Sequence, residues 1–186
     1  MCWKSKNKPV KHIADKDIPV FKIGMLDGKE IVLPYFFQCG VEYQENTAYS
    51  ENNISPFYST KIEEHVIHKG LHSYALSNIR LKASHHMISG NIMPSVEIMT
   101  YRITPMSQDV IVNAQQYHAQ GLALMLCIIP KGAIYYINEI GEMVSNEIEV
   151  KRIIKNPFTL NKDNTTSVRS VDKVNKSLNN WEKGKL

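Results

Sequence analysis

The pattern of apolar and polar residues predicts a series of β-strands in the last third of the chain. Leu122–Ile129 is a continuous apolar run of strand length, which is typical of a strand covered on both faces. Aromatic and β-branched residues follow at 133–137, and a turn at 138–141 leads into alternating positions over 144–153. The region 121–154 is therefore interpreted as a C-terminal β-meander.

Further strands are predicted earlier in the chain. The segments 19–26 and 30–37 flank Asp27-Gly28, a dipeptide that favours a hairpin turn because Gly accepts positive φ. Pro34 places the return strand at an edge or a bulge, since proline cannot donate to a ladder. Val96–Ile103 also alternates in the manner of a strand.

Two other segments are predicted to be helices. In 76–89, Ser77 is a candidate N-cap, apolar residues recur at helical spacing, and Gly90 follows as a stop signal. In 107–120, apolar residues again share one helical face, and a glycine ends the pattern.

Strands, a helix, a strand, a helix and a meander in this order predict an α+β fold. The expected architecture is a mostly antiparallel sheet with two helices packed on one face and the β-meander at the C-terminal end. Composition predicts an extended basic arm at 1–17, a single α+β domain at 18–154 and a polar basic tail at 155–186. The tail is expected to be largely disordered or loosely docked, with a docked helix over Val171–Trp181 as the alternative.

Charge and cysteine content limit the expected partners and the expected cellular compartment. The net charge is +4, of which residues 1–16 carry +4 and residues 155–186 another +4, so the region between carries −4. Nucleic acid contact is therefore expected only through the basic arms, whose ordinary role is solubility. Three cysteines far apart favour a reducing compartment, and no apolar run or signal segment points to a membrane. We expect a cytoplasmic protein.

The sequence motifs of common nucleotide hydrolases, dehydrogenases, serine hydrolases and zinc proteases are absent. No cofactor and no metal are predicted. His68 and His72 have the spacing that suits a shared zinc ion on a helix, but Gly70 weakens that helix. The other histidines of this region are His65, His85 and His86.

A group of aromatic, basic and acidic side chains forms the candidate ligand site. Tyrosine faces stack on bases, and Arg binds phosphate. The alternative is ordinary strand packing with polar tips at the surface. The candidates are His72, Tyr74, Arg102, Tyr135, Tyr136 and Glu139.

An enzymatic alternative uses different chemistry. Removal of Met1 would expose Cys2 as an N-terminal nucleophile with its own amine as base, and nearby lysines would lower its pKa. His72 paired with Tyr74 or Glu139 is a second catalytic arrangement.

Four segments carry a resemblance. They are MCWKS (1–5), IPVFKI (18–23), GLHSY (70–74) and CIIPKGAIYYINEIGEMVSNEI (127–148). They resemble small uncharacterised proteins of gut Bacteroidales and their phages. The resemblance implies an accessory protein of a phage or mobile element and carries over no catalytic residue.

These observations favour a non-enzymatic accessory binding protein. Its ligand is expected to be a protein partner or a small nucleotide-like molecule, in an anti-defence type of role. The alternatives are the enzyme described above and a virion or assembly protein whose basic arms wrap a partner.

Overall fold

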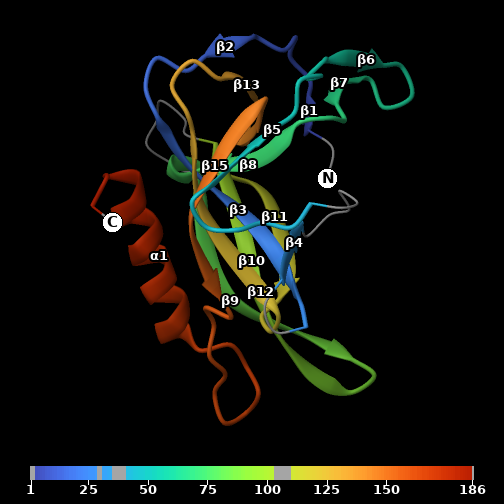
Figure 1. Cartoon of the computed structure of the whole chain (residues 1–186). Helices are drawn as coiled ribbons and strands as arrows, with labels where there is room; N and C mark the ends of the chain where they lie inside the picture. The colour runs from blue at the N-terminus through green and yellow to red at the C-terminus, as the bar shows by residue number, and fades with distance from the viewer. Residues whose placement is uncertain (1–2, 29–30, 35–40, 103–109, 186) are drawn as a thin grey trace.

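The computed structural model describes residues 3–28, 31–34, 41–102 and 110–185. Over these ranges the chain forms strands β1 to β15, one short 3-10 turn and the helix α1, and every strand pairing is antiparallel. Figure 1 shows an elongated molecule in which α1 lies along one side of the strands.

A nine-stranded sheet is the centre of the fold, with the order β2-β13-β14-β8-β3-β12-β15-β5 and β4 paired to β3. β12 lies between β3 and β15 and is covered on both sides, which suits a strand whose residues are apolar on both faces. The strands of the nine-stranded sheet are β2 (His12–Ile13), β3 (Ile18–Asp27), β4 (Ile31–Pro34), β5 (Thr47–Ser50), β8 (Leu71–Ala75), β12 (Leu122–Ile129), β13 (Ile134–Ile137), β14 (Glu142–Ser145) and β15 (Glu147–Lys155).

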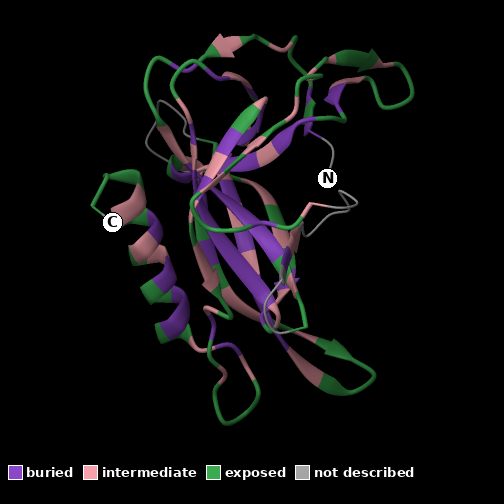
Figure 2. Cartoon of the chain, viewed as in Figure 1, coloured by how far each residue is buried: buried purple, intermediate pink, exposed green. Residues whose placement is uncertain are grey.

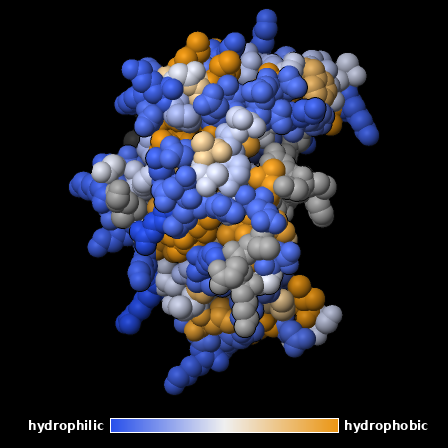
Figure 3. Space-filling model, in the orientation of Figure 1, coloured by the Kyte–Doolittle hydropathy of each residue, from blue (hydrophilic) through white to orange (hydrophobic). Residues whose placement is uncertain are grey.

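Two three-stranded sheets complete the fold, with the orders β1-β7-β6 and β11-β10-β9. Their strands are β1 (Trp3–Ser5), β6 (Phe57–Ser59), β7 (Glu64–Ile67), β9 (Ile79–Ile88), β10 (Asn91–Arg102) and β11 (Val110–His118). The outer half of the β9–β10 hairpin extends away from the body and exposes Met87 and Ile88 (Figures 1 and 3).

Alternation along β3 and β12 divides the core into two apolar clusters. Phe21 and Leu124 face the cluster that also contains side chains of β9, β10 and α1. Val20 and Met125 face the opposite cluster, which is formed largely by the central sheet itself. Figure 2 shows β3 and β12 as the most continuously buried part of the chain.

The first and last segments of the chain both contribute to the core. Trp3 is fully buried and packs with Tyr136. At the other end, α1 (Val168–Glu182) buries Val171, Val174 and Leu178. The predicted helix over 171–181 therefore lies inside α1, and its apolar side is part of the core rather than of a disordered tail.

The expectation of two helices packed on one sheet face is wrong, since both segments are strands. In β9, Ile79 and Leu81 are buried while Arg80 and Lys82 are exposed, a period of two that only a strand produces. The Ser89-Gly90 pair has positive φ at both positions and closes a two-residue hairpin instead of ending a helix.

The second predicted helix is largely β11. β-branched residues at 110–112 favour a strand, and a helical pattern of apolar positions does not distinguish the two structures over so short a segment. Residues 107–109 of that prediction lie outside the described ranges.

The predicted C-terminal meander is also corrected. β12 and β13 have the expected positions, but the last segment divides at Asn146 into β14 and β15. Consecutive strands do not all pair, because β12 lies beside β3 and β15 whereas β13 lies beside β2 and β14. In the described part of the chain, no helix combines the length and the apolar character needed to cross a membrane.

Candidate functional site

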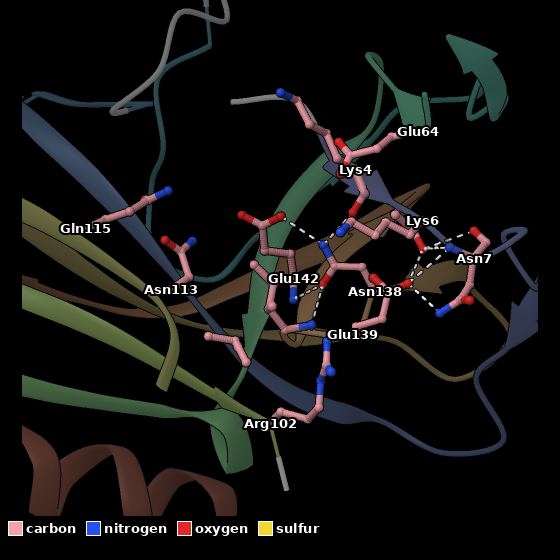
Figure 4. A pocket seen from close by; sticks show the side chains of 13 residues that line it. Lys4, Lys6, Asn7, Glu64, Arg102, Asn113, Gln115, Asn138, Glu139 and Glu142 are labelled. Carbon is pink, nitrogen blue, oxygen red and sulfur yellow. Dashed lines mark hydrogen bonds between the residues drawn. The ribbon is translucent and has the colours of Figure 1, made fainter. Parts of the chain in front are cut away.

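A polar pocket of about 750 Å³ opens where the two small sheets approach the central sheet (Figure 4). β1 and the residues after it form one wall, β10 and β11 form another, and the turn between β13 and β14 forms the base. Its charged residues are Lys4, Lys6, Glu64, Arg102, Glu139 and Glu142. Its amide side chains are Asn7, Asn113, Gln115 and Asn138.

Asn138 connects the base of the pocket to the wall. Its Nδ2 donates to the backbone oxygen of Lys4 at 2.9 Å and to Glu142 Oε2 at 3.0 Å. Its Oδ1 accepts from the backbone N–H groups of Ile140 and Glu142, which holds the turn closed. A single amide therefore positions the β13–β14 turn against β1.

Glu139 is engaged by the residues that follow β1. Its Oε1 accepts hydrogen bonds from Ser5 Oγ at 2.7 Å, from the Asn7 backbone N–H at 3.1 Å and from Asn7 Nδ2 at 2.6 Å. Burial alone would raise the pKa of Glu139, but these hydrogen bonds outweigh it and hold the pKa below its ordinary value.

Glu142 is the most buried of these acids, with 8% of its surface exposed. Burial raises the pKa of this carboxyl, and the hydrogen bond from Asn138 opposes the rise only in part. Its backbone oxygen accepts from Trp3 Nε1 at 3.0 Å, which fixes β1 over β14.

Gln115 links the pocket to the core. Its Oε1 accepts from Tyr117 Oη at 2.5 Å and from Tyr74 Oη at 3.5 Å. Burial, together with the neighbouring Tyr117, raises the pKa of the Tyr74 phenol far above its ordinary value, so it stays a hydrogen-bond donor. The side-chain amide of Gln115 is thereby held in one orientation at the pocket wall.

Three cations border the pocket without an ion-pair partner. Over the described ranges, Lys4, Lys6 and Arg102 have no carboxylate oxygen within 4.0 Å of a side-chain nitrogen. Figure 4 shows the Arg102 side chain running from the end of β10 toward the turn that carries Asn138 and Glu139. Glu64 is the pocket acid whose side-chain carboxylate accepts no hydrogen bond from another described residue.

The predicted ligand site is divided by the fold. Arg102 and Glu139 line the pocket, and Tyr74 contacts its wall through Gln115. Tyr135 instead stacks on His12 with ring centroids 5.1 Å apart. The fifth candidate, Tyr136, packs edge-on against a buried tryptophan.

His72, the sixth candidate, lies in β8 with a buried Nε2 atom that has no hydrogen-bond partner among the described residues. Burial lowers the pKa of its imidazole to about 4, and the nearby ammonium of Lys22 adds to the effect. His72 is therefore neutral near pH 7.

The histidines that could share a zinc ion have separate surroundings. His65 contacts Tyr58 at 5.1 Å and His68 contacts Phe57 at 4.9 Å between ring centroids, whereas His86 Nδ1 lies 2.7 Å from Ser95 Oγ. No three potential metal ligands gather among the described residues. Cys2, the predicted nucleophile, lies outside the described ranges.

Sequence reasoning missed most of the pocket. Lys4 and Lys6 belong to the predicted basic arm, and the charge of that arm does not indicate where these lysines lie in the fold. Asn113 and Gln115 were assigned to a helix, and Asn138 to an ordinary turn. No pattern in the sequence relates these segments, since β1 and the β13–β14 turn are more than a hundred residues apart.

Comparison with known proteins adds no family to this description. No protein-family model, no curated protein and no solved structure matches the chain.

Proposed function

We propose that this chain is a non-enzymatic binding protein whose pocket takes an anionic polar ligand. The observation that carries the proposal is the imbalance of engaged charges. Two of the three pocket acids, Glu139 and Glu142, already accept hydrogen bonds inside the protein, which leaves Glu64. In the described part of the chain, the three cations Lys4, Lys6 and Arg102 are without carboxylate partners. A ligand carboxylate or phosphate would supply the missing acceptors.

The expected strength follows from the number of contacts. A hydrogen bond to a charged group contributes about 1.5–3 kcal/mol, and an Arg fork can make two such bonds to one carboxylate or phosphate. Two amide side chains of the pocket, Asn113 and Gln115, add directional donors and acceptors, whereas Asn138 is fully engaged within the protein. Among the described residues that line the pocket there is no aromatic ring, so the proposal does not depend on base stacking.

Arg102→Ala tests the proposal. Isothermal titration with inorganic phosphate and with an acetylated, amidated Glu-rich peptide is expected to show saturable binding to the wild type, weakened roughly tenfold or more in the variant. Arg169→Ala is the matched control, because Arg169 is exposed on α1 away from the pocket. Equal binding by all three proteins, or by none, would refute the proposal.

Binding fits the site better than the enzymatic alternative does. Glu139 lines the pocket with one oxygen saturated by three donors, while His72 lies elsewhere, in β8, and is half-buried. The two are not brought to one cavity among the described residues. The enzymatic and virion alternatives remain predictions without an observation that favours them.

The proposal includes the cellular compartment of the protein and its accessory role. Cys127 is a free, buried thiol, which suits the reducing cytoplasm of a bacterial cell. The accessory role in a phage or its host rests on the sequence resemblance and stays a prediction.

A further inference from the structure

The two edges of the β9–β10–β11 sheet differ in how they are protected from pairing with a further strand. On the β9 side, Asn175 of α1 accepts from the Leu81 N–H at 3.0 Å and donates to the Leu81 C=O at 2.9 Å. Asn175 thus occupies the two backbone groups of Leu81 that a neighbouring strand would use. β9 also carries exposed Arg80 and Lys82, and such charges discourage pairing with other strands.

β11 has none of these protections. Its nine residues, VIVNAQQYH, include no Lys, Arg, Asp, Glu or Pro, and Val110 and Ile111 are about half exposed. Its register with β10 is regular from Asn113 to His118, because the one irregularity lies before that stretch. Over the described residues β11 pairs only with β10, so its other edge is free.

The register shows which backbone groups face outward. The Ala119 N–H donates to the Pro94 oxygen at 2.9 Å, so the odd-numbered residues of β11 point toward β10. Ala114 and Gln116 therefore present their N–H and C=O groups to the free edge. These are the groups that a further antiparallel or parallel strand would bind.

The pocket borders this edge. Val112, Asn113 and Gln115 of this edge strand line the pocket, and Val112 is the extra residue at the irregularity opposite Thr100 and Tyr101. A strand occupies roughly 160 Å³ per residue, from its rise, strand spacing and sheet spacing. The pocket volume of about 750 Å³ thus suits between four and five extended residues. Residues 4–7 line the same pocket, and a space for four to five residues suits one short strand rather than the sheet of a second copy.

We propose that the ligand of this pocket is an extended acidic segment of a partner protein, which adds to β11 as a fourth strand. The inference rests on the proposed function and names its ligand class. Main-chain hydrogen bonds to Ala114 and Gln116 supply affinity that is independent of sequence. Side chains on one face of the segment meet Lys4, Lys6 and Arg102, which selects Glu or Asp at alternate positions.

The test uses the full chain and a six-residue acetylated, amidated peptide of alternating Val and Glu. Two series of this peptide carry N-methyl groups on either the odd or the even amides. Strand addition predicts that one series loses binding roughly tenfold or more while the other keeps it, because only alternate N–H groups face β11. Equal loss or equal retention in both series would overturn the inference.

Ala114→Pro provides the protein-side test, since it removes an outward N–H from an edge strand, where proline is tolerated. The variant is expected to lose the peptide but to keep inorganic phosphate, which also shows that it folds. If phosphate binds to the wild type in an Arg102-dependent way and the peptide does not, the inference fails and the proposed function stands. If neither probe binds, both fail.

Discussion

Lys22 is a buried ammonium whose removal has a predictable effect on stability. It lies in β3 with 7% of its surface exposed, donates to the His72 backbone oxygen, and has its Nζ 5.4 Å from the ring centroid of Tyr43. Burial lowers the pKa of Lys22 from 10.5 to about 8. The proposed change is Lys22→Met, which keeps an unbranched side chain, one heavy atom shorter, and removes the charge.

The magnitude follows from the two pKa values. At pH 7 Lys22 is protonated in both states, and the difference between 10.5 and about 8 corresponds to about 3 kcal/mol of destabilisation. Methionine removes this cost, but it also loses the hydrogen bond to His72 and the contact with Tyr43, together worth about 2 kcal/mol. The variant is therefore expected to be about 1 kcal/mol more stable than the wild type at pH 7.

The pH dependence is the more specific result. Because the folded pKa of Lys22 lies below the unfolded one, the unfolded chain holds the proton more tightly between pH 8 and 10.5. The stability of the wild type rises relative to the variant over that window, by about 1 kcal/mol between pH 7 and 9. Burial raises the pKa of the Cys127 thiol to about 12, although the nearby Lys22 ammonium lowers it. Without Lys22 this pKa is higher still, so the thiol stays protonated in both folded proteins from pH 7 to 9 and contributes little to the difference between them over that range.

The assay is urea unfolding followed by tryptophan fluorescence at pH 7, 8 and 9. Lys131→Met is the matched control, because Lys131 is exposed and its charge stays in water on folding. A stability difference between wild type and Lys22→Met that is the same at all three pH values would refute the reasoning.

Two further substitutions test how the site is supported. Asn175→Ala is expected to destabilise by about 1–3 kcal/mol, because it leaves both backbone groups of Leu81 without partners, whereas Asn179→Ala on the exposed side of α1 should change urea unfolding little. Gly141→Ala is expected to lower the melting temperature clearly more than Gly132→Ala. Both glycines have positive φ, but a Cβ at 141 would lie 2.7 Å from a neighbouring side-chain atom while one at 132 meets nothing within 4 Å. Equal melting temperatures for the two alanine variants would contradict this account.

Some elements could be predicted because their signal is local. β12 is apolar at every position, and a run of that length bounded by proline and glycine has few other solutions. The β3–β4 hairpin and β13 also have their expected places, since turn residues and β-branched residues act over a few positions. Arg102 and Glu139 were candidates from residue type alone, and both line the pocket.

Other elements were decided by contacts that the local pattern does not contain. β9 and β11 contain apolar residues that match a helical face as well as a strand, and the outer part of β9 projects beyond the body, where burial does not mark its alternation. Pairing with β10 stabilises both as strands, because it satisfies backbone groups along their length. In the same way, α1 is part of the core only because β9 and β3 offer it an apolar surface.

The sequence by itself thus determined the strand-rich character, the turns and the apolar runs, since each depends on neighbouring residues. The tertiary structure alone decided the pocket. Lys4, Arg102 and Asn113 meet the turn at Asn138 because β1 docks on β14 through Trp3 and the β9–β11 sheet packs beside it. The contacts of β1 join segments more than a hundred residues apart. The free energy that holds the pocket together comes from packing of the whole fold rather than from any one segment.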